Sequence, residues 1–213
     1  MFVVHDLGVV PYQKAYVLQL EAHARVVAGG TPELLLLEHS RVITHGRKDL
    51  PDTNLLYPLE TLARLGIDVV ATERGGTATY HGLGQLVAYP IFRVGRKVRD
   101  FLRRLENVQI WVLAQYGLQA RPNPGYAGVY VGDDKIGSIG VAIKQNVAIH
   151  GLALNINTNL ADFDLIVPCG FQDTQMTSLQ KLLGYEIPMN EVKKHLIEAF
   201  RLEFTDFREV ETD

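Results

Sequence analysis

Residues 135–170 read KIGSIGVAIKQNVAIHGLALNINTNLADFDLIVPCG, and this stretch decides the fold and holds a candidate for the chemistry. The preceding residues Gly132, Asp133 and Asp134 predict a hairpin turn between two β-branched strands, and Lys135 begins the second of them. A further strand is predicted in NVAIHGLALNIN, residues 146–157. Because strands joined by tight turns run antiparallel, the region predicts an antiparallel sheet. The stretch ends beside Cys169, the one cysteine of the 213-residue chain.

Cys169 cannot form an internal disulfide, so it is a packed thiol, a metal ligand or a nucleophile. Pro168 stiffens the backbone before it, and Gly170 leaves room beside the sulfur and frees backbone N–H groups that could stabilise an oxyanion. By itself the Pro-Cys-Gly tripeptide favours a buried structural thiol. The nucleophile hypothesis therefore depends on the residues around it.

Outside this stretch, strands and helices alternate along the chain. Strands are predicted at 2–4, 34–38, 41–44, 67–72 and 86–92, and helices at 59–66, 98–116, 177–184 and around 192–200. After Pro11, a helix is predicted with Val17, Leu20, Ala24 and Val27 on its buried face. Residues 46–58 and the glycine-rich residues 73–85 are predicted as loops. This pattern predicts an α+β fold of mixed, mostly antiparallel sheets flanked by helices, in one domain over residues 1–213.

Composition restricts the class of protein. Hydrophobic residues make up 47% of the chain and charged residues 21%, which is typical of a compact globular protein. The formal net charge of −3 argues against a protein whose whole surface binds nucleic acid or an anionic membrane. Residues 1–16 lack the features of a secretory signal, and no run approaches a membrane span. We therefore expect a cytoplasmic protein without nucleic-acid or membrane partners.

The glycine-rich segment ERGGTATYHGLGQ, residues 73–85, could bring backbone N–H groups close to a ligand, with Arg74 holding a phosphate or carboxylate. A strained structural loop is an equal alternative, since neither GxxxxGK[ST] nor GxGxxG occurs. His81 and His150 have no second His or Cys at metal-ligand spacing, so no metal site is expected. Both are expected to be hydrogen-bonded structural residues, although His150 could pair with Cys169 in a cysteine hydrolase.

Two sets of basic residues are candidates for a function. An ammonium group near Cys169 would favour the thiolate, and Lys135 is a candidate, although Lys144 or Lys181 would serve equally by charge alone. A solvated turn lysine is the plainer alternative for Lys135. The segment RVGRKVRDFLRRLE, residues 93–106, is rich in arginine and suggests either docking of an acidic partner or a solvated helix face.

Taken together, four ordered motifs resemble those of the lipoyl(octanoyl) transferases, in the superfamily of lipoate- and biotin-protein ligases. RGGTATYHGLGQLVAYPI, residues 74–91, resembles the family pattern RGG-x-x-TYHGPGQ-x-x-x-YPI, and KIGSIGV, residues 135–141, resembles KIA-x-IGV. HGLALNIN, residues 150–157, and the Pro-Cys-Gly tripeptide complete the set. Leu83 stands where the family usually has Pro, and Gly137-Ser138 replaces Ala-Ala, which leaves the fine shape of the pocket in doubt.

The resemblance implies a biotin/lipoate-ligase-like catalytic domain that transfers an octanoyl group from acyl carrier protein. The acceptor would be a lysine on the lipoyl domain of a 2-oxoacid dehydrogenase or on glycine-cleavage H protein, and no cofactor is implied. Cys169 would carry the acyl thioester, and Lys135 would lower the pKa of its thiol and move protons. Three segments would line the acyl-substrate pocket: Arg74, Gly75, Gly76, Thr77, Ala78, Thr79, Tyr80 and His81; Ser138, Ile139 and Gly140; and Gly151, Leu152 and Ala153.

Three alternatives stay open. An ATP-dependent lipoate ligase would hold an acyl-adenylate with the glycine-rich segment and Lys135, and Cys169 would be dispensable. A non-catalytic acyl-binding or carrier-docking module would bind without turnover. A cysteine hydrolase would release free octanoate.

Overall fold

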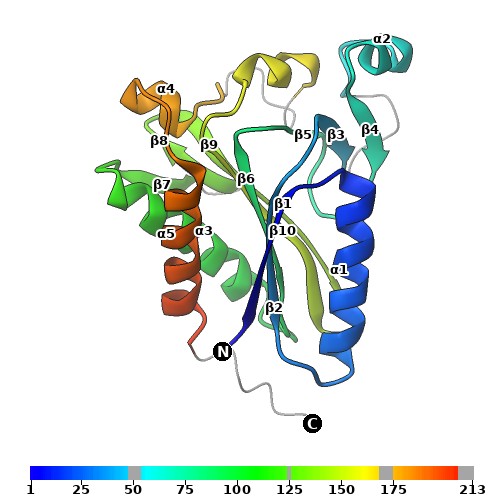
Figure 1. Cartoon of the computed structure of the whole chain (residues 1–213), viewed down its shortest axis with the longest axis vertical. Coiled ribbons are helices and arrows are strands. Elements are labelled where there is room, and N and C mark those ends of the chain that lie inside the picture. The colour runs from blue at the N-terminus through cyan, green and yellow to red at the C-terminus, as the bar shows by residue number, and fades with distance from the viewer. Residues whose placement is uncertain (48–53, 124–125, 168–174, 206–213) are drawn as a thin grey trace.

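The computed structural model describes residues 1–47, 54–123, 126–167 and 175–205, and its two β-sheets are packed with helices (Figure 1). The larger sheet has seven strands in the order β1-β2-β6-β10-β9-β8-β7. In that order their bounds are Val3–Val9, Glu33–Glu38, Gln85–Ile91, Val147–Asn155, Asp134–Lys144, Tyr126–Val131 and Ala120–Asn123. β1 runs parallel to β2, and the other neighbours in this sheet are antiparallel.

Helices cover both faces of the larger sheet. Helix α1 (Tyr12–Val27) lies on one face, where Ala15, Ala22 and Val26 are fully buried in an apolar cluster with β2, β6 and β10. Helices α3 (Val98–Gln115) and α5 (Met189–Glu203) pack together on the other face, and the short α4 (Leu179–Leu183) precedes α5 (Figure 1). The sheet is therefore the middle layer of three.

The smaller sheet has the order β4-β3-β5, with bounds Asp68–Ala71, Val42–His45 and Thr79–His81. It shares a separate apolar cluster with helix α2 (Leu59–Arg64) and the 3₁₀-helix η1 (Leu160–Leu165). Ile43 and Leu62 are fully buried in that cluster. This unit lies beside one end of the larger sheet (Figure 1).

The structure confirms the α+β class, the mostly antiparallel sheets and the hairpin that joins β8 to β9. The predicted buried face of α1 is wrong. Val17 and Leu20 are exposed, because the buried face carries the polar residues Gln19 and His23 among small apolar ones. Gln19 is fully buried, and its Oε1 accepts a hydrogen bond of 2.7 Å from the backbone N–H of His150. A polar side chain with a buried partner breaks the apolar periodicity that was used to choose the face.

The glycine-rich segment was predicted as a loop, but part of it forms the strand β5. Its three residues pair with β3, which a short strand bounded by glycines does not show in its sequence. Cys169 and part of the predicted loop at 46–58 lie outside the described residues.

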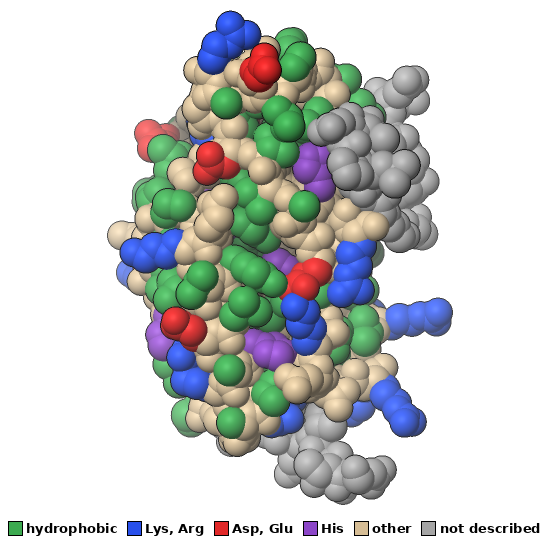
Figure 2. Space-filling model, turned by 90° about the vertical axis from the view of Figure 1, so that its right-hand side faces the viewer, with side chains coloured by type: hydrophobic (Ala, Val, Ile, Leu, Met, Phe, Trp, Pro, Cys, Tyr) green, Lys and Arg blue, Asp and Glu red, His purple; other side chains and the backbone are tan. Residues whose placement is uncertain are grey.

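On the face of the molecule turned toward the viewer in Figure 2, charged side chains of both signs are interspersed with apolar ones. Within the described ranges, no helix combines the length and apolar character that crossing a bilayer requires.

Candidate active site

A cavity of about 570 Å³ lies against β9 and β10, and the sequence motifs meet in its wall. It is lined from α1 by Tyr12, from β6 by Tyr89 and from α3 by Val98 and Leu102. A volume in this range is typical of small-molecule sites. The motif residues in its wall are Arg74, Gly75, Gly76, Thr77, Ala78, Thr79, His81, Lys135, Ser138, Ile139, Gly140, Gly151, Leu152 and Ala153.

β9 holds these motifs together because one of its edges is only partly paired. β10 pairs with β9 from Val147↔Lys144 to Leu154↔Gly137, whereas the pairing of β8 with β9 ends at Ser138. Beyond that point the backbone N–H of Gly75 donates to the Val141 carbonyl, at 3.0 Å. The glycine-rich segment is thus bound to the same strand that carries Lys135 and Ser138.

Arg74 is committed to this loop. Its guanidinium donates from Nη2 to the Thr44 carbonyl at 2.6 Å and to Thr44 Oγ1 at 2.9 Å, and from Nη1 to the Gly75 carbonyl at 3.0 Å. The side chain is 8% exposed. These bonds tie the loop to β3, so Arg74 orders the cavity wall and places a buried positive charge beside the cavity.

Two glycines leave space that a side chain would fill. A Cβ on Gly151 would lie 2.1 Å from the Ala88 carbonyl oxygen, so the close approach of β10 to β6 requires glycine there. A Cβ on Gly128, which has φ +143°, would lie 2.8 Å from Cε of Lys135. The absence of a side chain at Gly128 therefore provides the channel in which the lysine stem lies.

Lys135 is buried in the cavity wall, with 7% of its surface exposed. Its Nζ lies 3.4 Å from the Ala127 carbonyl oxygen and 5.9 Å from the centre of the Tyr130 ring. Its backbone N–H donates to the Gln175 carbonyl, and its carbonyl accepts from Thr177 N–H, both at 2.9 Å. The reading of Lys135 as a solvated turn lysine is therefore wrong, because the β8–β9 hairpin and residues 175–177 enclose it.

His39, His81 and His150 form a cluster of buried imidazoles beside the cavity, around Tyr89. Ring centres lie 5.5 Å apart for His39 and His81, 5.9 Å for His39 and Tyr89, and 6.2 Å for Tyr89 and His150. Burial lowers the pKa of His39 and of His150 to about 4. Burial, and then the neighbouring His39, lower the pKa of His81 to about 3. All three rings are consequently neutral at pH 7.

The hydrogen bonding expected of His81 is confirmed, and its ring also lines the cavity. Its Nδ1 lies 2.6 Å from Oε1 of Gln85, whose Nε2 donates to the Tyr80 carbonyl and to Asn155 Oδ1. Because these bonds fix which end of the Gln85 amide is the acceptor, Nδ1 of His81 is assigned as the protonated nitrogen. The orientation of this ring is therefore set from outside the cavity.

His150 differs from this expectation. Its backbone has φ +61°, and its ring stacks on Tyr16 at 5.9 Å. Among the described residues, neither its Nε2 nor Oη of Tyr12 has a hydrogen-bond partner, although both side chains are more than nine-tenths buried and line the cavity. The cavity thus presents polar atoms that are available to a ligand or to water.

Tyr80 lies apart from the other predicted pocket residues. In a strand, alternate side chains point to opposite sides, so Thr79 and His81 line the cavity and Tyr80 points away from it. Its hydroxyl donates to Asp162 Oδ2 at 2.7 Å, and its ring packs edge-on against Phe163 at 5.3 Å. Tyr80 therefore supports the cavity wall from behind, through Phe163.

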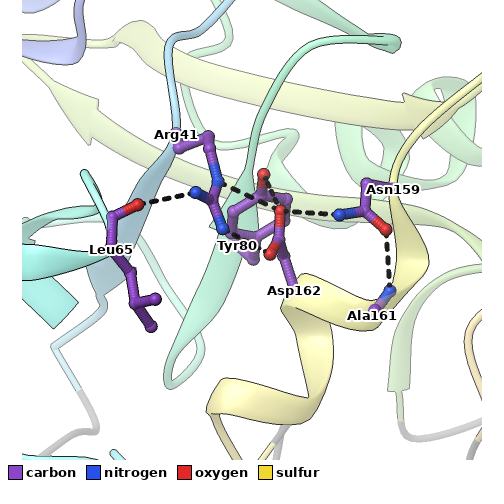
Figure 3. Close-up of polar contacts among 6 residues, drawn as sticks. All are labelled: Arg41, Leu65, Tyr80, Asn159, Ala161 and Asp162. Carbon is purple, nitrogen blue, oxygen red and sulfur yellow. Dashed lines mark hydrogen bonds and ion pairs between the residues drawn. The ribbon is translucent and has the colours of Figure 1, made fainter. Parts of the chain in front are cut away.

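Asp162, which is itself buried, is the centre of a hydrogen-bond network between η1 and the smaller sheet (Figure 3). Its carboxylate accepts hydrogen bonds from Nη2 and Nε of Arg41, at 2.6 and 3.2 Å, as well as from Tyr80. Nη1 of Arg41 donates to the Leu65 carbonyl at 2.7 Å, and Asn159 Nδ2 donates to Asp162 Oδ2 at 3.3 Å. The network fastens η1, and with it Phe163, to the smaller sheet.

Sequence reasoning missed the aromatic and apolar parts of the wall. These are Tyr12, Tyr89, Tyr130, Phe163 and Met176, together with Val98, Leu102, Ala127 and Val141. Val98 and Leu102 lie in the helix predicted at 98–116, but apolar periodicity does not separate a cavity wall from a packed core. For the tyrosines no signal in the sequence distinguished the two.

Comparison of the sequence with known proteins establishes the family. Residues 11–201 match the lipoyl protein ligase A/B catalytic domain. An octanoyltransferase of Rubrobacter xylanophilus is 47% identical over 91% of this chain and 89% of the relative. The chain belongs to the octanoyltransferases of this domain family. Octanoyltransferases are acyltransferases, which gives the enzyme class of the chain.

Two further proteins agree with this assignment. An octanoyltransferase of Deinococcus radiodurans is 56% identical over 97% of this chain, which spans 66% of that relative. A lipoate protein ligase from Thermoplasma acidophilum, solved in a study of that ligase and its E2 lipoyl domain, superposes with a TM-score of 0.76. It is 18% identical, and the match covers 100% of this chain and 87% of the ligase chain. This likeness confirms the lipoate-ligase-like fold.

The Asp162 network predicts a measurable loss of stability. We expect Asp162→Asn to lower the free energy of unfolding by about 1–3 kcal/mol, because the amide removes the charge and presents N–H groups to donors. Urea denaturation measures the change. Asp164→Asn, on the exposed side of the same 3₁₀-helix, is the control and should stay within about 0.5 kcal/mol of the parent. Equal effects at both positions would contradict the role of the network.

The buried histidines predict a loss of stability in mild acid. The unfolded chain binds protons at these positions below about pH 6.5, whereas the folded protein stays neutral there until about pH 4. Stability should therefore be constant above pH 7 and fall between pH 6.5 and 4, by up to about 1.4 kcal/mol per pH unit for each histidine. Urea denaturation at several pH values measures the slope.

His39→Gln should reduce that slope by one histidine's share. His195→Gln, on α5, keeps the three buried imidazoles and should keep the fall. A slope unchanged by His39→Gln would show that this ring does not stay neutral in the folded protein.

Proposed function

We propose that this protein transfers an octanoyl group from acyl carrier protein to a lysine of a lipoyl domain, as a step of protein lipoylation. One observation carries the proposal: the glycine-rich segment, the β9 and β10 motifs and the buried Lys135 converge on one cavity. The relatives named octanoyltransferase support the acyl group, and the ligase studied with its E2 lipoyl domain supports the acceptor. Glycine-cleavage H protein is proposed as a further acceptor.

Cys169 is the proposed acyl carrier of the reaction, although it lies outside the described residues. The flanking residues support its access to the site. Phe163 and Met176, on either side of residues 168–174, both line the cavity, and Gln175 is hydrogen-bonded to the backbone of Lys135. Cys169 is two residues beyond Val167, whose N–H donates to the Asn54 carbonyl. The chain therefore passes along this wall shortly before and shortly after the cysteine.

The proposed reaction has two acyl transfers. The Cys169 thiolate attacks the octanoyl thioester, a C–S bond to the enzyme forms, and the carrier thiolate leaves and takes up a proton. The deprotonated acceptor lysine then attacks the acyl-enzyme, which forms an amide and returns the thiolate. The first step exchanges one thioester for another, so its free energy is nearly balanced. The second step is favourable because an amide is more stable than a thioester. No nucleotide is needed.

Lys135 is the proposed proton carrier. Its ammonium group lies in the wall, where a positive charge favours the thiolate form of a nearby thiol. The neutral histidines do not supply this positive charge, because their lowered pKa values leave them uncharged at pH 7. Stabilisation of the oxyanion is proposed for backbone N–H groups of the glycine-rich loops.

An ATP-dependent lipoate ligase is the second candidate, because the fold matches a lipoate protein ligase. It predicts a reaction that requires ATP and free acid and does not require Cys169. The organisation as a single acyltransferase domain over residues 1–213 and the cytoplasmic location, both expected from the sequence, stay proposals.

Removal of the thiol should abolish transfer. We expect Cys169→Ala to remain folded and to lose octanoyl transfer, and the wild-type protein mixed with octanoyl donor to gain one octanoyl group by intact-mass spectrometry. Neutral hydroxylamine should remove that group, since it cleaves thioesters and spares amides. An adduct that persists on Cys169→Ala would contradict the proposal, and transfer that needs ATP and survives the substitution would establish the ligase alternative.

Removal of the Lys135 charge should slow the reaction while the protein stays folded. Lys135→Met keeps the apolar stem, and we expect it to lower kcat by about 10²–10⁴-fold, the usual range for a lost proton-transfer group. The rate of Cys169 alkylation should shift to higher pH, toward a thiol pKa of about 8.5. Lys144→Met is the matched control on the same strand, since Lys144 pairs with Glu73 at 2.6 Å and does not line the cavity. An unaltered kcat for Lys135→Met would exclude this role.

A further inference from the structure

The basic segment at residues 93–106 divides into two groups in the structure. Arg93 donates to the carbonyls of Val26 and Val27, at the end of α1. Arg103 and Arg104 pair with Asp100, at 2.9 and 2.8 Å. These three arginines are therefore used within the fold, where they satisfy helix-end carbonyls and balance a carboxylate.

The second group is Arg96, Lys97 and Arg99, at the turn that begins α3. All three side chains are exposed, and within the described ranges none of them has a hydrogen bond or an ion pair. Three uncompensated cations within four residues form a local positive surface on a chain of net charge −3. We call these three residues the α3 basic turn.

The α3 basic turn lies at the cavity. Val98, between Lys97 and Arg99, lines the cavity, and so does Leu102, one helical turn further along. Residues four apart in a helix share one face, so Val98 and Leu102 present the apolar face of this turn to the cavity. Both are only partly buried. The residues of the α3 basic turn therefore flank, along the chain, the point where α3 contributes Val98 to the cavity wall, although their own side chains do not line it.

We propose that the α3 basic turn is the docking site for an acidic surface of the protein that delivers the acyl thioester. The inference rests on the proposed function, because it concerns the partner of the same cavity. A donor protein must bring its acyl chain to the cavity, so the two proteins touch at the rim. A positive rim attracts an acidic donor surface and accelerates encounter.

The positive charge of the α3 basic turn favours the donor protein over the acceptor protein as its binding partner. The acceptor presents a lysine, which is an ammonium ion until it loses its proton. Three cations beside its path raise the energy of that approach, since like charges repel across a few ångströms even in high dielectric. A thioester is uncharged and meets no such barrier. Entry of the donor over α3 is therefore electrostatically favoured, and the acceptor is expected to approach from another side.

The test compares two donors with one enzyme. Arg96→Glu/Arg99→Glu reverses two charges, and acidic residues at a helix N-terminus favour the helix, so the variant should fold. With an octanoyl carrier protein as donor, we expect kcat/KM to fall by about 10-fold or more. We also expect the wild-type rate with this donor to fall steeply with added salt, and the rate of the variant not to fall in this way. Dissolved ions screen exposed charges, which act only over about 8 Å at physiological ionic strength. With octanoyl-pantetheine, a small uncharged donor, kcat/KM should be unchanged.

Lys194→Glu/Arg201→Glu is the matched control. Both residues are exposed on α5, neither lines the cavity, and the change in net charge is the same. The control should keep its rate with both donors. The proposal is overturned if the α3 variant loses rate equally with the two donors, if it loses none, or if the loss appears only in KM for the lipoyl domain.

A binding measurement tests the docking site independently of the proposed function. Titration of the carrier protein without an acyl group should show weaker binding to the α3 variant than to wild type or control. If wild-type protein transfers from neither donor, the proposed function is refuted, and the titration still decides the docking site. Equal binding to all three proteins refutes the docking site.

Discussion

The register of β9 against β10 is the constraint on which the site depends. Val141 pairs with His150 and Gly140 with Gly151, so two motifs distant in the sequence are brought side by side. The free edge of the same strand binds Gly75 through the Val141 carbonyl. Because side chains alternate along a strand, a slip of one residue in this pairing would turn Ser138 to the other face. The buried apolar side chains on both faces prevent that slip.

A buried wall with few charged groups is the second property of the site. The cavity wall holds the buried guanidinium of Arg74, which is bonded to Thr44, the side chain of Lys135, and the imidazoles of His81 and His150, which their surroundings keep neutral. Such a wall suits an uncharged ligand, because binding it leaves few ions buried and unpaired. The tyrosine and histidine atoms that lack partners among the described residues, Tyr12 Oη and His150 Nε2, give the cavity a polar part as well. A purely apolar tunnel would not provide hydrogen bonds of this kind.

Local patterns in the sequence were enough to predict the hairpin, most strands and the long helix α3, because each has its own periodicity or turn residues. The predicted pocket residues were found through resemblance, and all of them except Tyr80 line the cavity. Cys169 lies outside the described residues. Tyr80 could not be separated from its neighbours, since the alternation of a three-residue strand becomes visible only when its partner is known. The inner face of α1 was missed for a similar reason: Gln19 is buried because the His150 amide requires an acceptor, 131 residues away.

The pairing of Arg41 with Asp162 joins residues 121 positions apart, and Lys193 reaches Asp6 across 187. Chains whose contacts are this distant in sequence fold slowly, because a large loop must close before the contacts can compensate for its lost entropy. On the ribosome, the cavity wall lacks Met176 until most of the chain has been made. A nascent chain therefore lacks a complete cavity wall until the ribosome has synthesised the chain beyond Met176.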